Sequence, residues 1–107
     1  MKKILILFVS LCFCVTLFAQ KKIKVACVGN SITYGYTLPD RETKAYPAKL
    51  QKMLGDDYVV GNFGKSGATL LNKGHRPYMQ QEEYHKAIDF AGDIVVIHLG
   101  INDTDPR

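Results

Sequence analysis

The sequence has 107 residues, enough for one small domain, and a formal net charge of +4 at neutral pH. So small a charge does not favour nucleic acid or an anionic membrane surface as a partner. The chain contains no internal repeat, no low-complexity segment and no linker.

The first 19 residues have the organisation of a secretory signal peptide. Two lysines precede an apolar run from Ile4 to Phe18, and Ala19 favours cleavage before Gln20. The run is short for a membrane span, which disfavours the alternative of an uncleaved anchor. We therefore expect residues 1–19 to be removed, leaving 20–107 as a periplasmic or secreted chain with no stable membrane anchor. Loss of the two lysines would lower the net charge from +4 to +2.

The cysteines predict no internal disulfide in the mature chain. Cys12 and Cys14 leave with the signal peptide, so only Cys27 remains. Because Cys27 lies within an apolar run, we interpret it as a small buried apolar residue.

The first half of the mature chain predicts a strand, a helix and a second strand. The apolar run Ile23–Val28 is typical of a buried strand. One helical face then carries Tyr46, Leu50, Met53 and Leu54, with Pro47 in the first turn and Gly55 as the C-terminal cap. Residues 58–62 follow as the second strand.

The second half adds one helix and one strand. Tyr84, Ala87, Ile88 and Ala91 have helical spacing, and Gly92 ends the helix. Ile94–Leu99 is an apolar run broken only by His98, as in a strand covered on both faces. Alternating strands and helices predict a parallel α/β sheet with right-handed crossovers and the first strand in the centre.

Each predicted strand is followed by a turn rich in glycine, asparagine or serine. The turns are Gly29 to Gly35, Asn62 to Gly67, and Gly100 to Asp103. The carboxyl ends of parallel strands open on one edge of the sheet, where α/β proteins place reactive groups. We therefore expect the three turns to form one site.

That edge has the groups needed for acyl transfer. Ser31 supplies a hydroxyl nucleophile, and three donors can stabilise a developing oxyanion. These donors are the backbone amides of Ser31 and Gly64 and the side-chain amide of Asn102.

In order and spacing, the three turns resemble the first three sequence blocks of the SGNH (GDSL-type) hydrolases. The resemblance covers essentially the whole mature chain and is closest to the sialate O-acetylesterase-like branch. It implies a three-layer α/β/α, flavodoxin-like sandwich, with Ser31 as nucleophile and Ser31 N–H, Gly64 N–H and the Asn102 amide as the oxyanion hole. The commoner first block has aspartate where this chain has Asn30, a position that is not one of the family's chemical groups.

The catalytic base of that family is a histidine in an Asp-x-x-His block, which this sequence does not contain. His75 is most simply a solvated loop residue, His85 lies beside the apolar face of the second helix, and His98 is interpreted as a core or pocket-wall residue. We therefore expect the sheet to be truncated after its third strand, and residues 20–107 alone to be an inactive and poorly stable N-terminal part of an SGNH domain.

Other motifs fit less well. Gly64, Lys65 and Ser66 match the end of a phosphate-binding P-loop, but Val59 stands in place of its first glycine. The first turn could instead bind a flavin or a sugar phosphate, as a non-catalytic flavodoxin-like module. That alternative does not account for Gly64 and Asn102 together.

The resemblance to SGNH hydrolases implies a serine esterase that removes acetyl groups from carbohydrate, such as sialic acid or xylan. No cysteine, histidine or carboxylate cluster has metal-ligand spacing, so we expect neither metal nor cofactor. Oligomeric state has no sequence signal.

Overall fold

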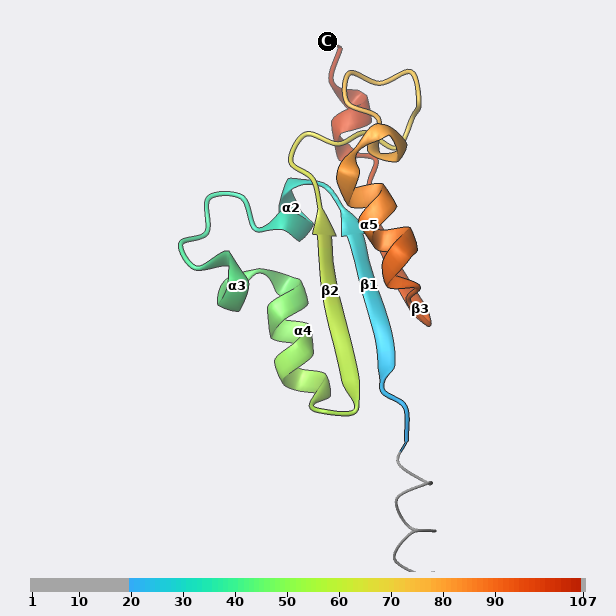
Figure 1. The fold of residues 1–107 in the computed structure, drawn as a ribbon. Helices are drawn as coiled ribbons and strands as arrows, with labels where there is room; N and C mark the ends of the chain where they lie inside the picture. Colours follow the sequence, from blue (N-terminus) through green and yellow to red (C-terminus); the bar gives the residue numbers. More distant parts are fainter. Residues whose placement is uncertain (1–19, 107) are drawn as a thin grey trace, which may run out of the picture.

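Three parallel strands form the centre of the computed structural model, which describes residues 20–106 (Figure 1). Strand β1 (Ile23–Gly29) lies between β2 (Tyr58–Gly64) and β3 (Ile94–His98), in the order β2-β1-β3. The pairing aligns Gly29 with Gly64 on one side and with His98 on the other. The predicted parallel sheet with a central first strand is confirmed, and the three turns leave its same edge.

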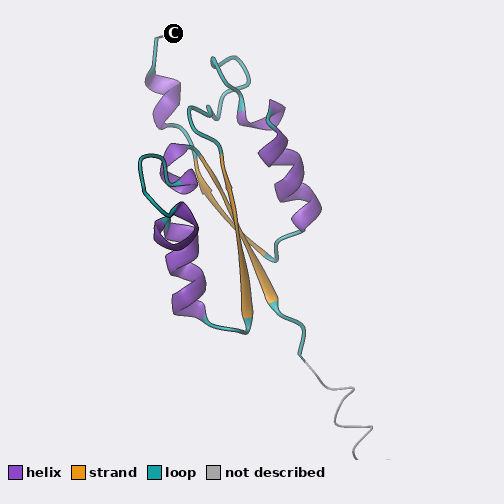
Figure 2. Ribbon diagram, turned by 60° about the vertical axis from the view of Figure 1, so that its left-hand side comes forward, coloured by secondary structure: helices purple, strands orange, loops and turns teal. Residues whose placement is uncertain are grey.

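Helices cover both faces of the sheet, which gives the three layers of an α/β/α sandwich (Figure 2). One face carries α4 (Tyr46–Leu54) together with the short helices α2 (Ser31–Tyr34) and α3 (Arg41–Lys44). The other face carries α5 (Glu82–Phe90). Two 3₁₀ turns, η1 (Tyr78–Gln80) and η2 (Ile101–Thr104), precede α5 and follow β3.

Strand β1 is central because it is apolar on both faces. Its residues from Val25 to Gly29 are all buried, and Cys27 is completely enclosed. Burial raises the pKa of the Cys27 thiol. Cys27 is thus the small buried residue that the sequence predicts.

The two long helices end at different kinds of residue: α4 ends at a glycine cap and α5 at an alanine cap. Gly55 caps α4 at a φ of +81°, as predicted. For α5 the sequence predicts Gly92 as the cap. The residue in the left-handed backbone conformation is instead Ala91, at a φ of +53°. Gly92 instead lies against β1, where an added Cβ would stand 3.0 Å from the Cβ of Ala26. Close packing, not helix capping, is the reason for a glycine there.

On both long helices, fewer apolar side chains are buried than the helical spacing predicts. On α4, Met53 is 83% exposed, and on α5, Ile88 is 61% exposed. Tyr84 and Ala87 do face the sheet, where they pack against a cluster of Val28, Ala68 and Tyr78.

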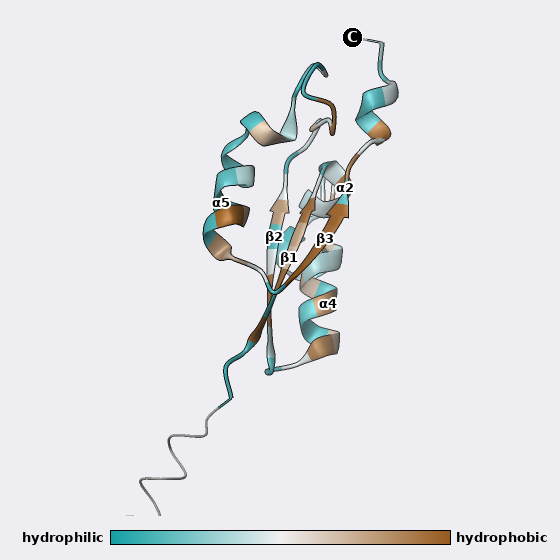
Figure 3. Cartoon of the chain, turned by 90° about the vertical axis from the view of Figure 1, so that its right-hand side faces the viewer, coloured by the Kyte–Doolittle hydropathy of each residue, from teal (hydrophilic) through white to brown (hydrophobic). Residues whose placement is uncertain are grey.

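Strand β3 differs most from expectation. The prediction of a strand covered on both faces is wrong within residues 20–106, where all five of its residues are exposed. Val95 is 53% and Ile97 65% exposed. Strand β3 forms an edge of the sheet, and hydrophobic residues follow one another along it (Figure 3). The expected further parallel neighbour of this strand is not among the described residues.

The predicted signal peptide, residues 1–19, lies outside the described part of the chain. Within residues 20–106, no helix is long and apolar enough to span a bilayer.

Candidate active site

Ser31 is the first residue of helix α2, directly after the carboxyl end of β1. Asn30 is the N-cap, and its Oδ1 accepts a hydrogen bond from Ile32 N–H at 3.0 Å. Asn30 is completely buried, and its Nδ2 has no hydrogen-bond partner within residues 20–106. Gly35 ends the helix in the left-handed conformation, at a φ of +89°. The polar turn expected from sequence is therefore a capped single helical turn that presents Ser31 at its start.

This turn of helix is held tightly on the sheet. A Cβ at Gly29 would overlap the hydroxyl of Thr33, so only glycine lets α2 approach β1 this closely. The Thr33 hydroxyl lies 3.1 Å from the hydroxyl of Tyr46, which comes from α4. Burial raises the pKa of Tyr46, so this phenol stays neutral and can serve as a hydrogen-bond donor.

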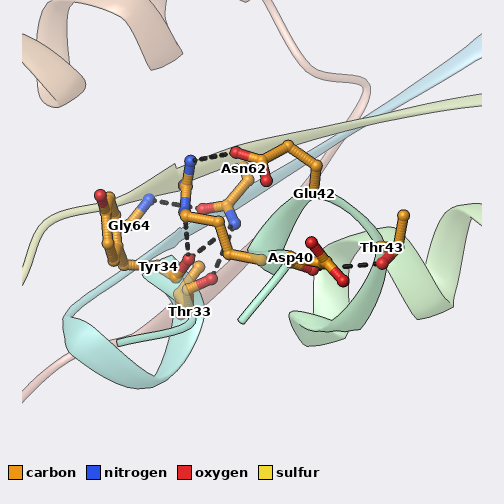
Figure 4. Close-up of polar contacts among 8 residues, drawn as sticks. Thr33, Tyr34, Asp40, Glu42, Thr43, Asn62 and Gly64 are labelled. Atoms are coloured by element: carbon orange, nitrogen blue, oxygen red, sulfur yellow. Dashed lines mark hydrogen bonds and ion pairs between the residues drawn. The ribbon is translucent and has the colours of Figure 1, made fainter. Parts of the chain in front are cut away.

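Gly64, the last residue of β2, lies beside α2 (Figure 4). Its N–H donates to Oδ1 of Asn62 at 3.0 Å, while Nδ2 of the same asparagine donates to the carbonyl of Thr33 at 2.8 Å. The Gly64 amide is thus already hydrogen-bonded within the protein. A Cβ at Gly64 would stand 2.6 Å from Cα of Tyr34, so this glycine allows close contact between β2 and α2.

A pocket of about 430 Å³ opens beside Ser31. Its walls come from three segments: the first turn, the end of the second turn, and the loop before η1. The lining residues are Ser31, Tyr36, Ser66, Gly67, His75 and Arg76. Gly64 and Asn102 are not among them.

Gly67 is the glycine that shares this pocket with the serine. It has a φ of +79°, a left-handed conformation that favours glycine. Its N–H has no acceptor within the described residues, in contrast to the amide of Gly64. The N–H of Ser31 also lacks an acceptor there, as expected for the first turn of a helix. Two residues that line the pocket, Ser31 and Gly67, therefore have backbone N–H groups without an acceptor among residues 20–106.

The third turn is joined to the second. Asn102 Nδ2 donates to the carbonyl of Ala68 at 2.9 Å. The Asp103 carboxylate accepts the N–H groups of Leu70 and Leu71 at 2.9 and 2.7 Å. These two backbone hydrogen bonds hold the pKa of Asp103 below its usual range. An amide nitrogen carries two hydrogens, so Asn102 retains one donor beyond its bond to Ala68.

The three histidines differ in their distance from the site. His75 lines the Ser31 pocket and lies near enough to Asp103 for the two to interact electrostatically, although no hydrogen bond joins it to Ser31. His85 is on α5, with its ring 5.4 Å from that of Tyr84. His98, expected in a core or pocket wall, is exposed at the end of β3, and its carbonyl accepts from Asn30 N–H at 3.3 Å.

No group of three or more potential metal ligands occurs within residues 20–106. The pocket is lined by hydroxyl, imidazole and guanidinium groups and contains no carboxylate. Its chemistry suits an ester carbonyl or an anion better than a cation.

Two features of the site were not predicted. Asn30 was set aside as chemically neutral, yet its capping bond fixes the residue that follows it; the strand–Asn–Ser sequence carries that signal. In the second turn the resemblance assigns the oxyanion donor to Gly64, whereas Gly67 is the glycine that lines the Ser31 pocket. The Lys65-Ser66-Gly67 continuation is the only hint that the chain turns back toward Ser31.

Comparisons with known proteins agree with this geometry. Residues 27–107 match the model of the GDSL-like lipase/acylhydrolase family. An acetylxylan esterase of Xylanibacter ruminicola is 52% identical over 88 residues, which are 82% of this chain and 18% of that protein.

The similar solved structures include AlinE4, an SGNH-hydrolase family esterase, and a point mutant of it. Both have a TM-score of 0.59 and 26% identity, covering 79% of this chain and 43% of theirs. The chain thus spans about a fifth of the curated relative and less than half of these structures. None of these comparisons distinguishes the sialate O-acetylesterase-like branch.

Proposed function

Because this chain belongs to the GDSL-like lipase/acylhydrolase family, we propose that the full-length protein is a serine esterase that removes acetyl groups from carbohydrate. The observation that carries this proposal is the placement of Ser31 at the start of α2, in a pocket beside the unused amide of Gly67.

The proposed reaction proceeds through an acyl-enzyme. Ser31 Oγ attacks the ester carbonyl carbon as a base takes its proton, and the carbonyl oxygen becomes an oxyanion. Collapse of this intermediate expels the sugar alcohol, which receives a proton, and leaves an acetyl group on Ser31. Water then attacks the acetyl-enzyme and releases acetate.

We assign the oxyanion hole to the N–H groups of Ser31 and Gly67 and to the side-chain amide of Asn102. Gly67 replaces Gly64 in this assignment because the Gly64 N–H is committed to Asn62. Asn102 is included because its bond to Ala68 holds it next to Gly67. Donors fixed before the reaction begins are the most effective, since they need no reorganisation.

The base is not assigned to a histidine of residues 20–106. A base must reach the serine hydroxyl through a hydrogen bond or a single water. His75 is in the same pocket but forms no such bond, and His85 and His98 do not line the pocket. The resemblance to SGNH hydrolases implies a histidine of an Asp-x-x-His block.

For the carbohydrate carrier, xylan has more support than sialic acid. The relative from X. ruminicola carries the name acetylxylan esterase. The pocket of about 430 Å³ has room for a sugar ring beside Ser31, and its lining combines the aromatic ring of Tyr36 with hydroxyl, imidazole and guanidinium groups. Aromatic and hydroxyl groups together are suited to the faces and edges of sugars.

The test is turnover by the full-length protein on 4-nitrophenyl acetate and on acetylated xylan. Ser31→Ala is expected to abolish turnover of both. Thr43→Ala is a suitable control because it also removes one hydroxyl, on the exposed helix α3 away from the pocket. Full activity in the Ser31 variant would contradict Ser31 as the nucleophile, and absence of turnover by the wild-type protein would favour a ligand-binding role.

We also propose that residues 20–107 alone are inactive and prone to association. No histidine is bonded to Ser31 in this segment, and β3 leaves a long apolar edge uncovered, a known cause of aggregation. A soluble monomer that melts cooperatively and hydrolyses acetyl esters through Ser31 would contradict both points.

Export is a separate proposal, resting on the pattern of residues 1–19. It is tested by the N-terminus of the protein recovered from the producing cell. Cleavage before Gln20 supports a periplasmic or secreted protein, and an intact Met1 contradicts it.

A further inference from the structure

The Ser31 pocket carries positive charge on one side only. Arg76 supplies that charge and His75 is its neighbour in the lining, and none of the six lining residues is acidic. Acyl transfer at Ser31 uses neither of these two side chains in the mechanism above. Arg76 and His75 are therefore available for another function in the same pocket.

Arg76 is held in place by the turn that carries Gly67. Its Nη1 donates to the carbonyl of Ser66 at 3.0 Å. Its side chain also lies over Gly67, with Nη1 3.5 Å and Cδ 3.7 Å from where a Cβ would be. Arg76 is exposed to solvent, but this hydrogen bond and this contact hold its guanidinium beside the proposed oxyanion donor.

The loop that carries Arg76 is closed on itself. Thr69 N–H donates to the carbonyl of Arg76 at 2.8 Å, and Tyr78 N–H donates to the carbonyl of Thr69 at 2.9 Å. Thr69 is completely buried, and its hydroxyl donates to the carbonyl of Leu71. Asp103 holds the other side of the loop through Leu70 and Leu71. The backbone on which Arg76 stands is accordingly well fixed.

Arg76 has no carboxylate partner within residues 20–106. Four other cations there do form ion pairs with acidic side chains: Arg41, Lys44, Lys65 and Lys86. Nη1 is the one guanidinium nitrogen of Arg76 with a hydrogen bond to that part of the protein. Its Nε and Nη2 groups, which together form the edge that binds a carboxylate through two parallel bonds, remain unused.

We propose that Arg76, assisted by His75, binds a carboxylate on the alcohol part of the ester, so that the preferred substrate is an acetylated acidic sugar or a glycan with a uronic acid at the acetylation site. This inference rests on the proposed esterase function and names its substrate class. Arg76 supplies a fixed fork for the carboxylate, and His75 adds a hydrogen-bond donor beside it. The acid group would be anchored on this side of the pocket while the acetyl carbonyl lies at Ser31.

The test compares two esters that differ in one group, using the full-length protein. The substrates are O-acetylated methyl glucuronoside and O-acetylated methyl glucoside, which carry a carboxylate and a hydroxymethyl group at the same carbon. Wild-type protein is expected to prefer the acid by 10-fold or more in kcat/KM, the usual range for a hydrogen bond to a charged group. Arg76→Gln should raise KM for the acid at least 10-fold more than it raises KM for the neutral ester, and any effect on kcat through the Gly67 turn should be the same for both esters.

Two further variants separate recognition from loop structure. Arg76→Lys keeps the positive charge but cannot form two parallel hydrogen bonds to a carboxylate. Its KM for the acidic ester should lie between those of wild type and Arg76→Gln. Lys73→Gln removes one positive charge from the same exposed loop but does not line the pocket, so it should match wild type on both esters. Equal effects of Arg76→Gln on the two substrates would overturn the proposal.

A binding measurement distinguishes failure of this inference from failure of the proposed function. Titration calorimetry of glucuronate into the Ser31→Ala protein should detect binding that Arg76→Gln weakens at least 10-fold, and glucose should not compete. Binding that does not depend on Arg76 overturns the carboxylate subsite even where esterase activity is intact. Arg76-dependent binding without turnover of any ester in the Ser31-intact protein supports the subsite and overturns the esterase.

Discussion

The side-chain amide of Asn102 donates a hydrogen bond to the backbone carbonyl of Ala68 at 2.9 Å. This bond joins the turn after β3 to the turn after β2, although the two residues are 34 positions apart. It holds Asn102 next to Gly67, which lines the pocket of Ser31. The three motif turns are therefore linked in space through Asn102 and the segment from Ser66 to Ala68.

Replacement of Asn102 by alanine tests whether this amide acts on the transition state. Removal of one oxyanion donor costs about 3 kcal/mol in the activation barrier, or roughly 10²- to 10³-fold in kcat. We expect that loss in the full-length Asn102→Ala protein on 4-nitrophenyl acetate, with KM little changed. The thermal melt reports any separate effect of the lost bond to Ala68. A folded variant with wild-type kcat would remove Asn102 from the oxyanion hole.

The Asp103 carboxylate makes the stability of the loop that carries Arg76 dependent on pH. Its pKa is lowered in the folded protein by the N–H groups of Leu70 and Leu71. A carboxyl group with a depressed folded-state pKa stabilises the protein above its unfolded pKa, about 3.9, and this contribution disappears as pH falls through the folded value. Asp103→Asn should therefore lower Tm at pH 7 and make less difference at about pH 3.

The control for that experiment is Asp89→Asn, an exposed carboxylate on α5 with no hydrogen bond or ion pair within residues 20–106. It should change Tm little at either pH. A decrease for Asp103→Asn that is the same at both pH values would contradict the role given to its charge.

Gly64 is predicted to be needed for the position of Ser31 rather than for donation to substrate. In Gly64→Ala the new Cβ would stand 2.7 Å from the carbonyl carbon of Thr33, so α2 has to shift. Overpacking of this kind costs about 1–3 kcal/mol of stability. We expect kcat to fall as well, because α2 carries Ser31.

Gly55→Ala is the matched comparison for that variant. Gly55 also has a positive φ, +81°, but a Cβ there would meet nothing within 4 Å. Its replacement should cost about 1 kcal/mol through backbone strain alone and leave kcat unchanged. If both variants lose stability without loss of kcat, Gly64 does not position the nucleophile.

The sequence was sufficient for the sheet and for the position of Ser31 after β1, because both depend on local patterns. Apolar runs and helical spacing place β1, β2 and α4, and the strand–turn sequence places Ser31 at the edge where the strands end. The glycine whose amide is left unused could not be identified in this way. Gly64 and Gly67 are three residues apart in one turn, and only the side chain of Asn62 determines which amide is left unused.

The exposure of β3 and the placement of Arg76 in the Ser31 pocket depend on contacts that local patterns do not encode. The run from Ile94 to Leu99 has the composition of a covered strand, but the described residues provide no neighbour for its outer edge. Arg76 stands in an ordinary polar loop by sequence. It reaches the Ser31 pocket because the loop from Thr69 to Pro77 closes through backbone bonds.

The central claim is that Ser31 is an activated nucleophile, and covalent labelling tests it most directly. The full-length protein is treated with a fluorophosphonate, which reacts with activated serine hydroxyls, and the adduct is located by peptide mass spectrometry. The account predicts one adduct, on Ser31, that forms at the rate at which acetyl-ester turnover is lost. Complete absence of an adduct on Ser31, or inactivation that follows labelling of Ser66 instead, would contradict it.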